Sequence, residues 1–265
     1  MSKVVRSRSI PKVEIERFWT HLQGFLSELD ASPDEEFSKT LVRNFLASTF
    51  YGENHALNTN NPTDLVIYAD ASAKGSHPVV LFEIKHHTND EMVRRGDLNR
   101  KALHELILYY LREEMLMHNT DIKHLVVTDG FQWFIFDKKV FYECFASKKK
   151  FTDSVLTADA EKNKTRYIYD QIIRPYVDTL GNQLRYTYFR MDVVAQVKPE
   201  HVSHSRKVAS AFKLLSPEHL LKQAVMYDRN ELSTAFYHEL LYIMGLEEVM
   251  VDGIARIRRC KPKTT

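Results

Sequence analysis

The sequence is poor in cysteine, and Cys144 and Cys260 stand far apart without a Cys-x-x-Cys spacing. This argues against a disulfide framework and against a thiolate zinc site, and a reducing cytoplasm is the expected location. No apolar run approaches the roughly 18 residues that a membrane span needs, so no membrane partner is expected. The first residues, MSKVVRSRSIPK, lack the apolar core and the cleavage site of a signal peptide. Internal repeats and low-complexity tracts are also absent from the sequence.

The composition is that of a globular protein. Of the 265 residues, 44% are hydrophobic, which is enough for a sizeable core in one large domain or two smaller ones. Charged residues of both signs are interspersed, and the net charge is only +2, so the chain as a whole is not a polycation. The basic residues instead form local clusters, which become relevant only where a site needs a polyanion nearby.

The first part of the chain predicts two helices, three strands, a helix and two more strands. The helices are expected at 13–30, 32–52 and 98–117, and the strands at 55–60, 63–70, 78–86, 122–130 and 131–137. In the second helix, Ser32 and Glu35 form an expected capping box. Phe37, Leu41 and Phe45 form its expected inward stripe. We therefore expect an α/β domain over residues 1–150, with a central mixed sheet flanked by helices.

The character of the sequence changes after residue 150. Helices are expected from 161 to about Pro175, at 216–225 and at 232–249, and one strand at 184–193. We therefore expect residues 151–265 to form a mostly helical extension, or a connector to a further region.

Two charges interrupt an apolar strand in the segment PVVLFEIKHH, residues 78–87. Side chains alternate along a strand, so Glu83 and Lys85 project from the same face. In the preceding strand, Asp64 is the acidic residue that can join them. A turn centred between residues 73 and 74 puts Asp64 opposite Glu83, and one centred between 74 and 75 puts it opposite Lys85. Either register brings the three side chains together.

Such a group of charges has two interpretations. Two adjacent carboxylates can bind Mg²⁺ together with waters and a phosphate, and a nearby lysine can position water or neutralise charge on the phosphate. Asp64, Glu83 and Lys85 would then form a phosphodiester-hydrolysis site. Alternatively, the charges form a cross-strand ion pair that stabilises the sheet. The pattern alone leaves both interpretations open.

Pro62-Thr63-Asp64 followed by Glu83-Ile84-Lys85 resembles the signature of PD-(D/E)XK nucleases, with Thr63 as a spacer. The surrounding segments resemble the N-terminal nuclease region of type IIG restriction-modification enzymes, from about residue 35 to 258. These segments are NFLASTFYG, TDLVIY, VVLFEIK, NRKALHELILYYLREE, IKHLVVTDGFQWFIFD and LLSPEHLLK. The resemblance implies a PD-(D/E)XK restriction-endonuclease-like core in the α/β domain.

By this resemblance, Asp64, Glu83 and Lys85 are the catalytic residues, and Asp64 and Glu83 hold the metal. The implied cofactor is Mg²⁺, for which Mn²⁺ can substitute. Glu36 matches a further acidic residue of the family and is a third candidate ligand, although it could equally pair with Lys39 or Arg43 on its own helix.

Basic and polar residues beside the charged strand are candidates for contacts with double-stranded DNA. They lie at the start of the helix that follows this strand and in the loop before it, where a helix N-terminus favours a phosphate. The candidates are Arg94, Arg95, Asn99, Arg100 and Lys101. Solvated side chains at a helix end are an equally good explanation. Farther along this helix, Tyr109 and Tyr110 are assigned to the core.

The sequence departs from the type IIG pattern in one respect. It has no Asn-Pro-Pro-aromatic motif and no glycine-rich loop for S-adenosylmethionine, so methylation and sequence recognition are expected elsewhere, in cis or in trans. The expected function is that of a Mg²⁺-dependent DNA endonuclease domain, with a homodimer on DNA as one way to supply two active sites. The alternative is a catalytically idle DNA-binding or scaffolding module with the same fold.

Overall fold

A computed structural model describes residues 9–52, 54–60, 63–73, 76–161, 164–223, 234–251 and 254–259. The chain divides into two compact units, residues 1–223 and 224–265, and each is described by itself. Pro62, the turn residues Lys74 and Gly75, and Cys260 belong to the expectations above but lie outside the described residues.

A mixed six-stranded sheet forms the centre of the first unit, with its strands in sequence order. The strands are β1 (Leu57–Asn60), β2 (Thr63–Tyr68), β3 (Pro78–Ile84), β4 (His124–Thr128), β5 (Gln132–Asp137) and β6 (Thr187–Arg190). Only β3 and β4 pair in parallel, and α4 lies between them in the sequence. The other neighbours are antiparallel. The expected α/β class and the expected order of elements up to residue 137 are confirmed.

The helices of the first unit surround this sheet. The α-helices are α2 (Lys12–Asp30), α3 (Glu35–Leu46), α4 (Lys101–Leu111), α5 (Lys138–Phe141), α6 (Lys149–Ala160), α7 (Thr165–Tyr167), α8 (Arg174–Leu180), α9 (Met191–Ala195), α10 (Arg206–Leu215) and α11 (Pro217–Leu220). Within the described residues, π-helical segments extend them at Ala47–Tyr51, Arg112–Leu116, Tyr142–Ala146 and Ile168–Ile173. Two short 3₁₀ segments lie at Gly181–Gln183 and Pro199–His204.

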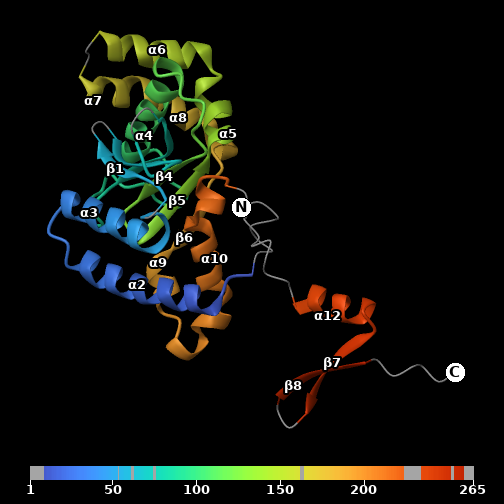
Figure 1. Ribbon diagram of the computed structural model, residues 1–265. Helices are drawn as coiled ribbons and strands as arrows, with labels where there is room; N and C mark the ends of the chain where they lie inside the picture. Colours follow the sequence, from blue (N-terminus) through green and yellow to red (C-terminus); the bar gives the residue numbers. More distant parts are fainter. Residues whose placement is uncertain are drawn as a thin grey trace. The chain divides into compact units, whose positions relative to one another are not determined.

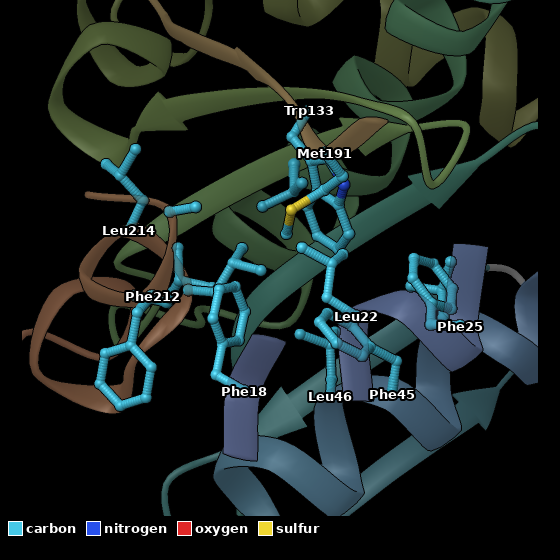
Figure 2. Packing of buried hydrophobic residues seen from close by; sticks show 14 of the residues in the cluster. Phe18, Leu22, Phe25, Phe45, Leu46, Trp133, Met191, Phe212 and Leu214 are labelled. Carbon is cyan, nitrogen blue, oxygen red and sulfur yellow. The ribbon is translucent and has the colours of Figure 1, made fainter. Parts of the chain in front are cut away.

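The sheet separates two hydrophobic cores, because its strands are apolar on both faces. Figure 1 shows α2 and α3 on one side of the sheet and α4, α6, α7 and α8 on the other. The first core joins α2, α3 and α10 to one face of the sheet, and Figure 2 shows Phe18, Leu22 and Phe45 packed below Trp133 of β5. The second core packs α4, α6 and α8 against the opposite face, which carries Val66, Leu81 and Val127.

The pairing of β2 with β3 follows the first of the two expected registers. Leu65 pairs with Phe82 and Val66 with Leu81, as in that register, and the pairing shifts by one residue only farther along, between Ile67 and Tyr68. Continued by one residue from Leu65, the register sets Asp64 opposite Glu83, and the amide of Ile84 donates to Oδ2 of Asp64 at 2.8 Å. Because side chains alternate, Asp64, Glu83 and Lys85 project toward α4.

Two details of α3 differ from expectation. The helix begins two residues later than predicted, since the side chain of Asp34, and not that of Ser32, accepts the amide of Phe37 at 2.8 Å. Ser32 instead donates its hydroxyl to the carbonyl of Asp34. The ring of Phe37 is 45% exposed, so the inward stripe of this helix consists of Leu41, Val42, Phe45 and Leu46.

The sheet does not end with the first 150 residues, because β6 lies beside β5 and comes from the predicted extension. The expected strand at 184–193 is therefore present, and the first compact unit runs to residue 223. Whether residues 151–265 act as a connector stays a prediction.

The second unit contains α12 (Thr234–Ile243) and the antiparallel strands β7 (Leu246–Val251) and β8 (Ile254–Arg259). The prediction of a helix to residue 249 is wrong for its last part. Gly245 has a φ of +72°, a left-handed conformation that ends α12 before β7 begins. Among the described residues of both units, no helix has the length and apolar character needed to span a bilayer.

Candidate active site

Asp64, Glu83 and Lys85 converge where β2 begins and β3 ends. Glu83 is 1% exposed and Lys85 is 4% exposed, so both charges are buried. The ammonium of Lys85 lies 2.7 Å from Oε1 of Glu83. The backbone holds Lys85 in place, because its amide continues the parallel ladder and donates to the carbonyl of Thr128 at 3.0 Å. The three predicted catalytic residues are thus close neighbours on one face of the sheet.

Helix α4 adds a carboxylate that the sequence analysis missed. Oε2 of Glu105 lies 2.6 Å from Nζ of Lys85, so Lys85 bridges Glu83 and Glu105. Glu105 is the only acidic residue between Lys101 and Leu111, and an isolated charge in an otherwise apolar helix was the signal that could have indicated it. Its position against β3 depends on long-range packing, which the sequence does not reveal.

Helix α3 contributes Glu35 and Lys39, which were also missed. Nζ of Lys39 lies 2.8 Å from Oδ1 of Asp64, and Oε1 of Glu35 lies 3.6 Å from Nζ of Lys85. The predicted ligand Glu36 has a side chain that is 83% exposed, and it pairs with Lys39 at 2.7 Å. That is the same-helix pairing recognised as its alternative. Glu35, one residue earlier, is the carboxylate that faces Lys85.

The buried charges change one another's protonation. Burial raises the pKa of Glu83 well above its ordinary value, and the nearby charge of Asp64 raises it further, against the opposing effect of Lys85. Burial opposes ionisation of Glu105, but its interaction with Glu83 and the charge of Lys85 outweigh this and lower its pKa. The pKa of Lys85 is raised, because the two carboxylates outweigh the effect of its burial. Lys85 is therefore a cation at neutral pH.

Two tyrosines border this cluster. Tyr109 follows Glu105 by one turn of α4 and is half-buried, whereas Tyr110 is fully buried in the second core. Burial, together with the charges of Glu83 and Glu105, raises the pKa of Tyr109. The core assignment is therefore confirmed for Tyr110. Tyr109 instead lies close enough to the site for the charges of Glu83 and Glu105 to affect its pKa.

The donor set suits a hard divalent cation. Oε2 of Glu83 is buried and has no hydrogen-bond partner among the described residues, and Asp64 supplies a second carboxylate beside it. Mg²⁺ typically takes one or two carboxylates, with waters and a phosphate completing its shell. No group of three or more acidic, histidine or cysteine side chains in the described ranges forms a preassembled metal site. Asp64 and Glu83 could thus hold a cation that depends on further ligands.

The predicted DNA-binding residues all have partners within the chain. Arg94 pairs with Asp90, Arg95 lies over the ring of Tyr188, Asn99 bonds Asp178, Arg100 pairs with Asp97, and Lys101 pairs with Glu91. Asn99, Arg100 and Lys101 border a cleft of about 850 Å³ whose lining mixes basic with acidic side chains. Their contact with DNA stays a prediction.

The chain belongs to the family described as "Domain of unknown function (DUF7149)", whose profile matches residues 1–228. This match covers the central sheet and every site residue described above. Searches of curated proteins and of solved structures give no match.

Proposed function

We propose that the chain is a Mg²⁺-dependent DNA endonuclease domain of the PD-(D/E)XK type, related to the nuclease region of type IIG restriction-modification enzymes. The observation that carries this proposal is the placement of Asp64, Glu83 and Lys85 on one face, where β2 begins and β3 ends. The match to a family of unknown function neither favours nor opposes it.

In this proposal, Asp64 and Glu83 hold the metal, which when bound supplies Lewis-acid activation of a water and of a phosphodiester oxygen. Lys85 acts as a cation, because the raised pKa of its ammonium leaves it unsuited to accept a proton. Its role is to neutralise charge that develops on the phosphate. Glu105 keeps Lys85 directed into the site in the absence of substrate.

A second candidate is an idle DNA-binding or scaffolding module. The observation that favours it is the degree of internal charge pairing. Lys85 satisfies Glu83 and Glu105, and Lys39 satisfies Asp64, as they would in a purely structural network. Against it stands the buried Oε2 of Glu83, because an unpaired buried carboxylate oxygen is costly in a site that serves only stability.

Nicking of supercoiled plasmid with Mg²⁺ or Mn²⁺ separates the two candidates. We expect weak, non-specific nicking at high protein concentration, because recognition and methylation are assigned to a region in cis or in trans. Glu83→Gln should abolish it, whereas Glu143→Gln, on an exposed side chain paired with Lys139, should leave it unchanged. Folded wild-type protein that binds DNA without nicking it would support the idle module. Efficient site-specific cleavage would contradict the assignment of specificity elsewhere.

A further inference from the structure

Lys39 sits among three carboxylates beside the candidate site. Its ammonium lies 2.8 Å from Oδ1 of Asp64, 2.7 Å from Oε1 of Glu36 and 3.4 Å from Oε1 of Glu35. The Lys39 side chain is only 13% exposed, although lysine is mostly exposed in folded proteins. Hydrogen bonds to Asp64 and Glu36 therefore hold this side chain in one place.

The two oxygens of Asp64 are both engaged in this arrangement. Oδ2 accepts the amide of Ile84 at 2.8 Å, and Oδ1 faces Lys39. The neighbouring carboxylate differs, because Oε2 of Glu83 is buried and has no hydrogen-bond partner among the described residues. A cation-binding oxygen is thus available on Glu83, whereas the one on Asp64 is already occupied by an ammonium group.

An exposed acceptor lies next to Lys39 on the same helix. Glu36 precedes it by three residues on α3, and its side chain is 83% exposed. A rotation of the lysine side chain toward solvent would keep the pair with Glu36 while releasing Oδ1 of Asp64. The same helix thus carries both the cation that occupies Asp64 and the acceptor that can receive it.

We propose that Lys39 is an internal competitor of the metal, which covers Oδ1 of Asp64 in the empty site and moves onto Glu36 when a divalent cation binds. This inference rests on the proposed function, since it takes Asp64 and Glu83 to be the metal ligands. Lys39 is a positioning residue here, and Glu36 acts through it without binding the metal. The apparent affinity for the metal is then the intrinsic affinity multiplied by the fraction of molecules in which Lys39 leaves Asp64 uncovered.

Titration calorimetry with Mn²⁺ alone, and with Mg²⁺ alone, tests this competition without an activity readout. Lys39→Met should bind Mn²⁺ about tenfold more tightly than wild type, because every molecule then has Oδ1 of Asp64 available. Arg43→Met is the matched control, since it removes the same charge from the same helix and Arg43 bonds the carbonyl of Leu57 and not Asp64. Its affinity should stay near that of wild type.

The possible outcomes separate this inference from the proposed function. If wild type binds Mn²⁺ and Lys39→Met binds it no more tightly, the competition is refuted while the metal site stands. An equal gain in Arg43→Met would also refute it, because general charge removal would then explain the effect. If neither wild type nor Lys39→Met binds Mn²⁺, the metal site of the proposed function fails, and the competition fails with it.

A second variant keeps the test decisive if Lys39→Met does not fold. Lys39→Gln also removes the ammonium but keeps an amide that can donate to Asp64 or Glu36, so it should fold and bind Mn²⁺ severalfold more tightly than wild type. A folded Lys39→Gln variant with the Mn²⁺ affinity of wild type would refute the inference.

Discussion

Glu105 of α4 lies 2.6 Å from Lys85 and shares that ammonium with Glu83. Helix α4 therefore fixes the direction of the proposed catalytic lysine. Glu105→Gln keeps the shape of the side chain and removes its charge, so we expect plasmid nicking to fall at least tenfold. Stability should drop by only about 1–2 kcal/mol, because Lys85 keeps Glu83 as a partner. Nicking at the wild-type rate by a folded Glu105→Gln variant would show that Lys85 needs no such support.

Removing Asp64 as a ligand should abolish metal binding. Asp64→Asn preserves an oxygen that can accept the amide of Ile84, so we expect the fold to persist. Loss of the pair with Lys39 and relief of repulsion with Glu83 oppose each other, so the melting temperature should change little. Titration calorimetry should then detect no Mn²⁺ binding. Binding equal to that of wild type would reject Asp64 as a ligand.

Lys85→Met separates a catalytic lysine from a structural one. The substitution leaves Glu83 and Glu105 without their shared partner, and we expect a loss of stability on the order of 3 kcal/mol in metal-free protein. Nicking should be abolished while Mn²⁺ still binds and restores part of the lost stability. Urea unfolding with and without Mn²⁺, beside the nicking assay, provides the measurements. A destabilised variant that nicks as wild type does would leave only the structural ion pair.

The buried pair His124 and His219 predicts acid sensitivity. Burial lowers the pKa of His124 to about 4 and that of His219 to about 3, so both rings are neutral in the folded chain. Because these values lie below the unfolded value of about 6.5, the stability that the rings contribute is complete above pH 6.5 and is lost as the pH falls toward 4.

At pH 4, keeping each ring neutral lowers the free energy of unfolding by on the order of 3 kcal/mol relative to neutral pH. His219→Leu removes one such group, and Nε2 of His219 has no hydrogen-bond partner among the described residues. Urea unfolding at pH 7, 5.5 and 4.5 should show a shallower decline for this variant than for wild type. Parallel curves would mean that His219 does not titrate in this range.

Gly130 should be intolerant of a side chain. It turns the chain between β4 and β5 with a φ of +83°, and an added Cβ would overlap the Cδ2 atom of Leu29 in the first core. Gly130→Ala should therefore cost about 3 kcal/mol, from backbone strain and overpacking together. Gly96→Ala is the matched control, because its φ is +85° but no atom lies within 4 Å of the added Cβ. Its cost should be about 1 kcal/mol, from strain alone. Equal losses in thermal melts would refute the packing explanation.

Local signals in the sequence predicted much of this structure. Alternation predicted that Asp64, Glu83 and Lys85 share one face of the β2–β3 pair, but it left open whether Asp64 faces Glu83 or Lys85. The apolar run at 122–130 and its aromatic partner at 131–137 likewise identified β4 and β5.

What could not be predicted depends on helix phase and on contacts between distant segments. On α3, the structure places Glu35 and not its neighbour Glu36 beside Lys85. Which of the two faces the site depends on where the helix begins, and in the sequence Ser32 was as good a candidate N-cap as Asp34, which caps the helix. Glu105 and Lys39 reach the site only because α4 and α3 pack against the sheet. Near the C-terminus, the LEEV segment suits a helix as well as a strand, and pairing with β8 decides for β7.

Strand β6 has a practical consequence for anyone who wants to produce the first 150 residues by themselves. Cutting the chain at the change of composition near residue 150 would remove the only neighbour of β5 on that side. The freed backbone groups, beside the aromatic side chains of Trp133 and Phe134, would form an open edge that recruits strands from other copies. Such a fragment should aggregate, whereas one that extends to Gln223 keeps the edge covered. Truncation experiments on this family should therefore begin from the longer piece.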